Sequence, residues 1–219
     1  MGLNLSNINN FIFDMDGVIT NTMPYHLKVW SKIFKDCGID VTWKDIYKRE
    51  GQKGIESVKE IFAEYGKPFS IRLGEQLLAR KEQHLKKIVQ VRFIPYSRNF
   101  LKHLHACSKR LALVTGTSRH AVLKILPKSI FELFDVVICG CDVQNGKPHP
   151  EPYLKALTKL KVFSNDTIAI ENAPFGIRSA KRAGLKCLAV TTSLPKEYLK
   201  EADHIFASVK DLKNHIQLL

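Results

Sequence analysis

The sequence predicts an α/β fold: a Rossmann-like, doubly wound parallel sheet as the core, with an inserted α-helical cap domain. Three observations predict it. Short apolar runs recur along the chain, helical patterns separate most of them, and one long interval contains no convincing strand. Strands that alternate with helices are typical of a parallel sheet that is covered by helices on both faces.

The predicted strands are short apolar runs rich in β-branched and aromatic residues, the composition that strands favour. They cover residues 11–13, 111–114, 136–139, 167–170, 187–191 and 204–206. The spacing between successive runs is regular except after the first, where the chain continues to residue 110 before the next strand begins. This interval therefore holds an insertion.

The sequence of the insertion predicts four helices. Pro24 at the start and Gly38 at the end delimit the first helix, and the stretch TWKD at 42–45 resembles a capping box with Asp in place of Glu. Apolar residues at helical spacing predict the other two over residues 54–65 and 70–89. No strand is expected among them.

Both connections of the insertion, near 17–21 and 91–96, fall beside the carboxyl edge of the predicted sheet. We therefore expect the helices to lie over that edge as a lid. The expected division is a core of residues 1–17 and 92–219 and a helical cap of residues 18–91.

Composition sets limits on the function. The 219 residues are 45% hydrophobic and carry a formal net charge of +13, which suits an anionic partner such as a phosphorylated metabolite or a nucleic acid. The basic residues are dispersed, without a stripe interleaved with aromatic side chains, so nucleic acid is not the expected partner. No apolar run is long enough to span a membrane, and residues 1–4 do not resemble a secretory signal, so we expect a cytoplasmic protein.

Chemically reactive or charged residues follow four of the predicted strands. In an open α/β sheet, ligands bind outside the carboxyl ends of the strands, so these residues should meet in one crevice. Each has an ordinary structural explanation by itself, as a turn, cap or surface residue, but their convergence indicates a functional site. They are Asp14, Asp16 and Gly17 after the first strand, Thr115 and Gly116 after the second, Lys147 after the third, and Glu171 and Asn172 after the fourth.

This order of residues resembles the haloacid dehalogenase superfamily of phosphotransferases over essentially the whole chain. The stretch FDMDGVITNTMPYH is most similar to the branch of β-phosphoglucomutase and phosphoglycolate phosphatase, whose helical cap is inserted at the same place. The resemblance is specific for the family and weak on the substrate.

The resemblance implies a role for each residue. Asp14 should attack phosphorus and form an aspartyl phosphate, and Asp16 should act as general acid and then as general base. The Thr115 hydroxyl, the Gly116 amide and the Lys147 ammonium should bind the transferring phosphoryl group. Relatives that remove halogen lack the second carboxylate, so Asp16 favours phosphate chemistry.

Magnesium is the cofactor that the resemblance implies, because it is a hard cation that prefers oxygen ligands and phosphates. The implied ligands are Asp14, the carbonyl oxygen of Asp16, Asn172, and Glu171 either directly or through water. Close relatives commonly have Asp at the position of Asn172. An amide oxygen brings no negative charge, so we expect weaker magnesium binding and not its loss.

Four cap residues match positions that face the substrate in β-phosphoglucomutase, namely His26, Trp30, Ser57 and Lys81. In that mutase a cap arginine holds the second phosphate of the sugar, and an ungapped alignment puts Gly54 at its position. Glycine offers no side chain for phosphate binding.

We therefore expect a magnesium-dependent phosphatase that hydrolyses a small phosphorylated metabolite, either a sugar phosphate or a compound like phosphoglycolate. The alternative is a sugar phosphomutase of the β-phosphoglucomutase type. A protein that binds nucleic acid or processes its ends is a third and weaker hypothesis, supported only by the charge. The expected enzyme is a monomer without a membrane partner.

Overall fold

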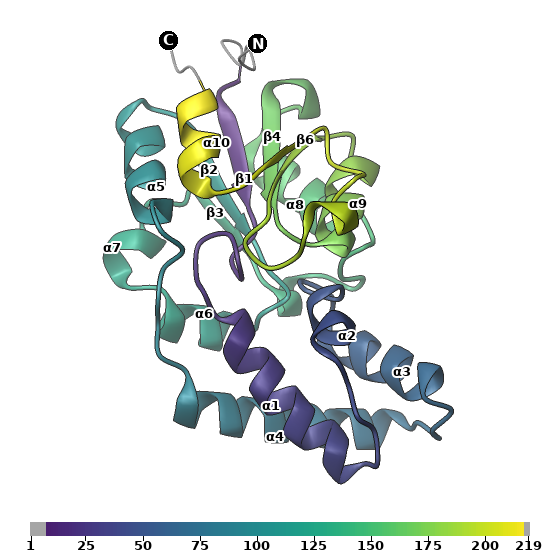
Figure 1. Cartoon of the computed structure of the whole chain (residues 1–219). Helices are drawn as coiled ribbons and strands as arrows, with labels where there is room; N and C mark the ends of the chain where they lie inside the picture. The colour runs from purple at the N-terminus through teal and green to yellow at the C-terminus, as the bar shows by residue number, and fades with distance from the viewer. Residues whose placement is uncertain (1–7, 217–219) are drawn as a thin grey trace.

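A six-stranded parallel sheet forms the centre of the molecule (Figure 1). The structure, a computed structural model, describes residues 8–216. Residues 1–4, from which we expect no secretory signal, lie outside the described residues. The strand order is β3-β2-β1-β4-β5-β6, and every neighbouring pair is parallel. The strands are β1 (Asn10–Phe13), β2 (Arg110–Val114), β3 (Val136–Ile138), β4 (Thr167–Glu171), β5 (Lys186–Val190) and β6 (His204–Phe206). The predicted strands and fold class are confirmed, with ends shifted by a residue at most.

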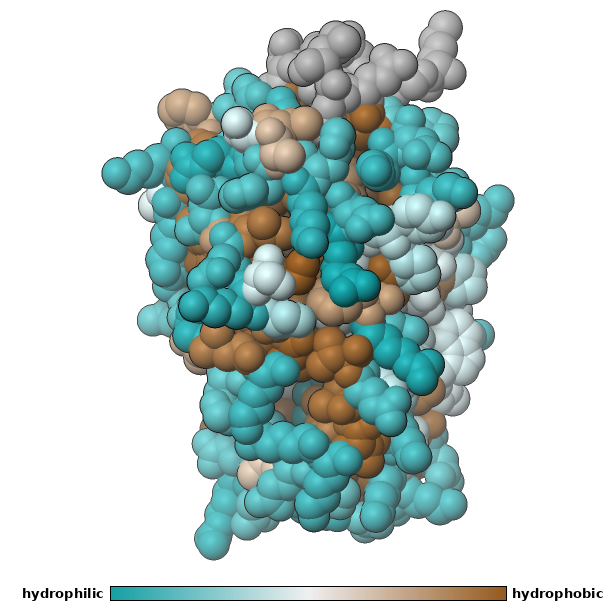
Figure 2. Space-filling view, turned by 90° about the vertical axis from the view of Figure 1, so that its left-hand side faces the viewer, coloured by the Kyte–Doolittle hydropathy of each residue, from teal (hydrophilic) through white to brown (hydrophobic). Residues whose placement is uncertain are grey.

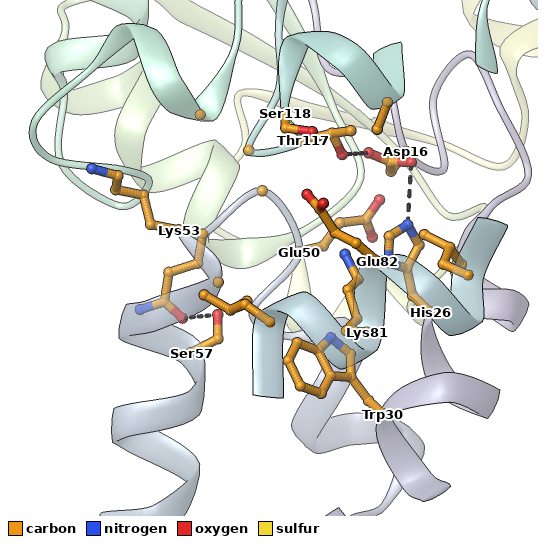
Figure 3. Close-up of a pocket in the computed structure, with 18 of the residues that line it drawn as sticks. Asp16, His26, Trp30, Glu50, Lys53, Ser57, Lys81, Glu82, Thr117 and Ser118 are labelled. Carbon is orange, nitrogen blue, oxygen red and sulfur yellow. Dashed lines mark hydrogen bonds and ion pairs between the residues drawn. The ribbon is translucent and has the colours of Figure 1, made fainter. Parts of the chain in front are cut away.

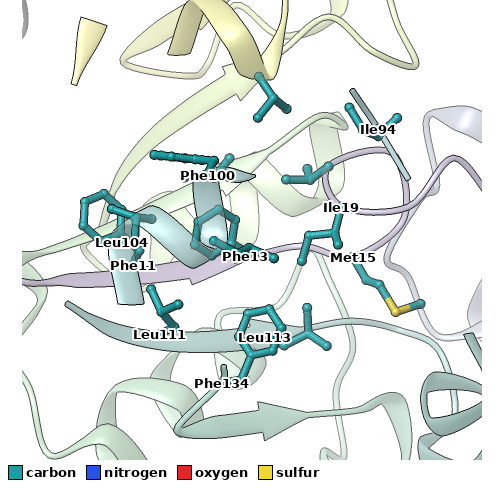
Figure 4. Packing of buried hydrophobic residues seen from close by; sticks show 14 of the residues in the cluster. Phe11, Phe13, Met15, Ile19, Ile94, Phe100, Leu104, Leu111, Leu113 and Phe134 are labelled. Atoms are coloured by element: carbon teal, nitrogen blue, oxygen red, sulfur yellow. The ribbon is translucent and has the colours of Figure 1, made fainter. Parts of the chain in front are cut away.

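Helices cover both faces of this sheet, and successive residues of β1 point to opposite faces. Phe11 and Phe13 pack into one core cluster together with Phe100, and the rings of Phe13 and Phe100 lie edge to face at 5.9 Å (Figure 4). Ile12 packs into the cluster on the opposite face. The helices of the first face are α5 (Ser97–Ala106), α6 (Arg119–Ile125), α7 (Lys128–Phe131) and α10 (Val209–His215), and those of the second are α8 (Glu151–Leu160) and α9 (Pro174–Arg182).

Four helices follow β1, as the sequence predicts. They are α1 (Met23–Asp36), α2 (Trp43–Tyr47), α3 (Gly54–Glu64) and α4 (Ile71–Ile88). The predicted capping box is present: the Thr42 hydroxyl accepts from the Asp45 amide, and the Asp45 carboxylate accepts from the Thr42 amide at 2.8 Å. In the described part of the chain, no strand of the sheet lies between β1 and β2, where only isolated bridges join Thr20 to Asp16 and Phe93.

These four helices have a hydrophobic core of their own. It contains Trp30 and Phe34 from α1, stacked at 5.0 Å between ring centroids, together with Phe62 from α3 and Leu77 from α4. Figure 1 shows this helical unit beyond the carboxyl ends of the strands. We propose the division into a core of residues 1–17 and 92–219 and a cap of residues 18–91 on this basis.

Three short 3-10 helices complete the described secondary structure. They span Gly140–Asp142, Ser164–Asp166 and Lys196–Tyr198. Between residues 8 and 216, no helix combines the length and the apolar character that a membrane crossing requires.

Candidate active site

The polar residues that follow four strands lie together at the carboxyl edge of the sheet. Lys147 links two of them, because its ammonium donates to Oδ1 of Asp14 at 2.6 Å and to Oε1 of Glu171 at 2.7 Å. It also donates to the carbonyl oxygen of Val114, at the end of β2, at 3.2 Å. The ends of β1, β2 and β4 are thus joined through one buried lysine.

Burial and charge perturb this group strongly. Burial raises the pKa of Asp14 to about 8, a rise that the positive charge of Lys147 opposes and the carboxylates of Glu171 and Asp16 reinforce. Burial opposes the charge on Lys147, but Asp14 and Glu171 outweigh it and hold the pKa of the ammonium above its ordinary value. Lys147 therefore stays charged, while the raised pKa of Asp14 favours its protonated form at neutral pH in the metal-free protein.

Asp16 has a different environment although it lies only two residues away. Its Oδ1 accepts from the Thr22 hydroxyl, and its Oδ2 accepts from the hydroxyls of Thr117 at 3.1 Å and Thr115 at 3.4 Å. His26 Nε2 lies 3.7 Å from Oδ1. Burial favours the neutral acid, but the contacts with His26 and Thr22 outweigh it, and the pKa of Asp16 falls to about 2.

The loop after β2 lies directly under the cap. Thr115 is buried, and its hydroxyl accepts from the amide of Thr117 at 3.1 Å. A Cβ added at Gly116 would lie 2.6 Å from the carbonyl oxygen of Gly51, which belongs to the cap loop between α2 and α3. Only glycine permits so close an approach of the two backbones, so Gly116 brings cap and core together beside Thr115.

Gly17 turns the chain away from the two aspartates. Its φ of 86° lies in the region that favours glycine, and an added Cβ would meet the Asn172 amide nitrogen at 2.1 Å. The loop after β1 can therefore pass against the loop after β4, which brings Asn172 beside the aspartates.

The oxygens of this site fit a cation. Both carboxylate oxygens of Glu171 are engaged, Oε1 by Lys147 and Tyr153 and Oε2 by the backbone N–H of Asn172. By contrast, Oδ2 of Asp14 and Oδ1 of Asn172 are buried and have no hydrogen-bond partner among the described residues. Buried oxygens without donors are what a hard cation satisfies.

Carboxylates alone do not form the expected metal site. Within residues 8–216, no group of three or more His, Cys, Asp or Glu side chains is arranged to hold a metal ion. The expected set differs from such a group because it uses the Asn172 amide and a backbone carbonyl. The free oxygens of Asp14 and Asn172 agree with that set, while Glu171 is occupied by other donors.

A cavity of about 540 Å³ lies between the cap and the core. Its lining includes Asp16 and Gly116 from the core and all four predicted cap residues: His26, Trp30, Ser57 and Lys81. Figure 3 shows the Lys81 amine pointing from α4 toward Asp16 and His26, with the Trp30 ring beside its stem. The space-filling view shows apolar side chains gathered where cap and core meet, around a hollow in the surface (Figure 2).

The cap cations differ in whether they can reach a ligand. The Arg49 guanidinium is bound by Glu60 and Glu64, and the Lys53 ammonium donates to the carbonyl oxygens of Val143 and Gln144. Lys81, by contrast, has neither a hydrogen bond nor an ion pair with any part of the described chain. Burial lowers the pKa of Lys81, and Asp16 opposes this effect.

Gly54 has a packing role that the sequence did not reveal. An added Cβ would lie 2.3 Å from Cδ2 of Leu78 on α4. Glycine therefore allows α3 to begin close against α4. An arginine at this position would require the Leu78 side chain to move aside.

Three residues near the site were not predicted from the sequence, and a fourth, Thr117, belongs to the stretch after the second predicted strand but had no predicted role. Thr22 and Thr117 hold Asp16, Tyr153 donates to Glu171 at 2.5 Å, and Glu50 accepts from the Asn172 amide at 2.9 Å. Thr117 had a local signal, since it directly follows the predicted Thr115–Gly116 pair. Glu50 had none, because it follows a short cap helix far from any strand.

Comparison with known proteins agrees with this geometry. A family model described as haloacid dehalogenase-like hydrolase matches residues 11–190. The chain is 31% identical over 215 residues to (DL)-glycerol-3-phosphatase 1, mitochondrial, of Arabidopsis thaliana, which covers 94% of this chain and 72% of that protein. It is 30% identical over 183 residues to the phosphorylated carbohydrates phosphatase of Thermotoga maritima, which covers 80% and 81%.

A solved structure extends the comparison. β-Phosphoglucomutase from Clostridium difficile matches with a TM-score of 0.82 at 27% identity, over 95% of this chain and 96% of that one. The expected β-phosphoglucomutase-like branch and the expected enzyme class, a phosphoric monoester hydrolase, are thereby confirmed. The matched family model spans most of the chain, and we conclude that the chain belongs to the haloacid dehalogenase-like hydrolase family.

Proposed function

We propose that the protein is a magnesium-dependent phosphatase that hydrolyses a small phosphorylated sugar or polyol through an aspartyl phosphate on Asp14. One observation carries the proposal. Asp16 lines the cavity with its carboxylate held by three threonine hydroxyls, while Asp14, two residues earlier, is held by Lys147. Two adjacent carboxylates in such different environments are suited to different roles in one reaction.

Asp14 is the proposed nucleophile. Its carboxylate attacks phosphorus, the bond to the leaving oxygen breaks, and the phosphoryl group remains on Asp14 until water displaces it. Lys147 fixes the orientation of Asp14 and carries positive charge beside the transferring group. The Thr115 hydroxyl and the Gly116 amide are the proposed donors to the phosphoryl oxygens.

Asp16 is the proposed general acid and base. It protonates the leaving oxygen in the first step and takes a proton from the attacking water in the second. The pKa of about 2 that its hydroxyl and His26 contacts produce is too low for an acid at neutral pH. A phosphate dianion beside Asp16 raises this pKa, so substrate binding itself prepares the acid.

The proposed magnesium ligands are Asp14, the Asp16 carbonyl oxygen and Asn172, with Glu171 in an indirect role because both of its oxygens are occupied. When bound, the cation supplies positive charge that keeps Asp14 ionised and offsets its repulsion from phosphate. The unpartnered oxygens of Asp14 and Asn172 support this assignment.

The cavity supports a small polar substrate. Trp30 offers a flat apolar wall, Lys81 a positive charge and Ser57 a hydroxyl, a combination that suits the carbon face and the hydroxyl groups of a sugar or polyol. The relatives named as phosphatases of glycerol 3-phosphate and of phosphorylated carbohydrates agree with this substrate class.

The direct test of the mechanism is Asp14→Asn. We expect phosphate release from p-nitrophenyl phosphate to fall by at least about 10,000-fold, as befits loss of a nucleophile. EDTA should abolish wild-type activity, and added magnesium should restore it. Activity like that of the wild type in the variant or in EDTA would refute the proposal.

A sugar phosphomutase remains the second candidate because the similar solved structure is a β-phosphoglucomutase. Position 54 has glycine in place of the arginine, and Arg49 and Lys53 are bound elsewhere. The cap lysines of the cavity lining, Lys81 and Lys86, are then the candidates to hold a second phosphate. Two readouts separate the candidates. Free phosphate without conversion of β-glucose 1-phosphate to glucose 6-phosphate supports the phosphatase, and efficient conversion with little free phosphate supports the mutase.

The other expectations are kept as part of the proposal. The partner is a small metabolite, the enzyme is a cytoplasmic monomer, and the charge of +13 serves anion attraction and not nucleic-acid binding. A gel-shift titration at about 150 mM salt should show no specific complex with nucleic acid.

A further inference from the structure

Glu50 is a buried carboxylate that the proposed mechanism leaves without a role. It lies in the loop between α2 and α3 of the cap and is only 5% exposed. Its Oε2 accepts a hydrogen bond of 2.9 Å from the Asn172 amide nitrogen, across the boundary between cap and core. A carboxyl group of the cap therefore contacts the one expected metal ligand whose side chain carries no charge. Burial and the nearby Asp14 raise the pKa of Glu50 well above its ordinary value in the metal-free protein, and a bound cation would favour its charged form.

The oxygens around Glu50 lack donors. Oε1 of Glu50, Oδ1 of Asn172 and Oδ2 of Asp14 are all buried, and none has a hydrogen-bond partner in the described chain. An unpaired buried carboxylate oxygen is costly, and here two carboxylates and an amide share one small region. A set of acceptors without donors is satisfied by a hard cation and by few other ligands.

The backbone holds Glu50 in this place. The next residue, Gly51, has a φ of 77°, and a Cβ added to it would lie 2.6 Å from Cδ of Lys147. The cap loop thus passes directly over the lysine that binds Asp14. Lys53, further along the same loop, donates to the carbonyl oxygens of Val143 and Gln144 and attaches the loop to the core.

We propose that Glu50 supplies from the cap the negative charge that Asn172 lacks, so that Asp14, Asn172 and Glu50 complete the magnesium site when the cap is closed. This inference rests on the proposed function. It has a consequence for dynamics: because Glu50 belongs to the cap, magnesium binding and cap closure stabilise each other.

Calorimetric titration with magnesium alone tests the proposal without relying on activity. Glu50→Gln retains an oxygen that can accept from the Asn172 amide and removes only the charge. We expect its magnesium affinity to fall by about 10- to 100-fold, the effect typical of changes beside a metal ligand. Glu82→Gln is the matched control, because Glu82 is a cap carboxylate that lines the same cavity and is exposed. The control should bind magnesium like the wild type.

A second variant places a negative charge at residue 172, on the core side of the proposed magnesium site. Asn172→Asp should bind magnesium more tightly than the wild type, and Asn172→Asp combined with Glu50→Gln should recover most of the affinity that Glu50→Gln loses. Such compensation is not expected if Glu50 only joins the cap to the core through a hydrogen bond. If Glu50→Gln alone folds poorly, the double variant compared with Asn172→Asp keeps the test decisive, because Glu50→Gln should cost much less affinity once position 172 carries the charge.

The outcomes separate this inference from the proposed function. A wild-type protein that binds no magnesium would overturn the proposed function and the inference together. A wild type that binds magnesium, with Glu50→Gln within about twofold of it, would overturn only the role of Glu50. A double variant that recovers none of the affinity lost by Glu50→Gln would do the same.

Discussion

The core and cap parts of the site are built in opposite ways. On the core side, Lys147, Asp14 and Glu171 are almost fully buried, do not line the cavity, and are joined by hydrogen bonds of 2.6 and 2.7 Å. On the cap side, Lys81 has no bonded partner among the described residues, and the Trp30 ring forms an apolar wall beside it.

We propose that this difference separates chemistry from recognition. Groups that must hold one geometry during phosphoryl transfer are fixed by partners from several strands. Groups that recognise the rest of the substrate keep their polar atoms free for it. The core side should therefore control turnover and stability, and the cap side should control affinity. Four predictions test this division, in order of decreasing free-energy change.

Removal of Lys147 should have the largest effect. Lys147→Met leaves the buried carboxylates of Asp14 and Glu171 without their cation, which typically costs about 3–5 kcal/mol. Urea unfolding in EDTA at neutral pH measures the loss, and activity should disappear as well. Lys53→Met is the control, since this lysine binds only carbonyl oxygens of the core and no carboxylate. A loss below about 1 kcal/mol for Lys147→Met would contradict the comparison.

Asp16→Asn should affect catalysis much more than folding. We expect kcat/KM for a phosphate ester to fall at least about 100-fold, the usual contribution of a positioned acid and base. Thr117→Val, which removes one hydroxyl from Asp16, should cost far less because Thr22 and Thr115 remain. If Asp16→Asn lost less than about tenfold, Asp16 would be a structural residue.

Lys81→Met should weaken substrate binding without slowing the chemical step. We expect KM to rise about tenfold, or about 1.4 kcal/mol, while kcat stays close to that of the wild type. Lys87→Met on the same helix is the control, because Lys87 is exposed and does not line the cavity. A fall in kcat with KM unchanged would place Lys81 among the catalytic groups and break the division.

The smallest effect concerns stability and pH in the metal-free protein. The folded-state pKa of Asp14 is about 8 and its ordinary value is 3.8, so the unfolded chain releases this proton first. The free energy of unfolding should therefore fall as pH rises from about 4 to about 8. Asp14→Asn removes this loss but also removes the carboxylate partner of Lys147, which offsets most of the gain. Its Tm should therefore exceed that of the wild type by only about 2–4 °C at pH 8 in EDTA, or roughly 1 kcal/mol.

Two further measurements sharpen this test. The gain for Asp14→Asn should shrink toward pH 5 and should reverse when magnesium stabilises the wild type. A Tm difference that does not change with pH would show that Asp14 does not titrate within this range.

Much of the molecule follows from the amino-acid sequence by itself. The apolar runs at 11–13 and 111–114 identify strands because a strand buried on both faces needs no polar side, and Gly38 and the Thr42–Asp45 capping box mark helix ends through local backbone chemistry. Parallel topology then brings the ends of the strands to one edge. That is why Asp14 and Lys147, which are 133 residues apart, could be predicted to meet.

Other features were decided only by the tertiary structure. The contact between Glu50 and Asn172 joins residues 122 positions apart, and it depends on how the cap lies on the core, which no local periodicity encodes. The same holds for Gly54, where the sequence indicated only a missing arginine and the structure shows a close contact with Leu78. Local patterns determine which residues form each element, because they report the burial of one face. The angle between two separately packed units depends on the fit of all the side chains between them, and that fit exists only in the folded protein.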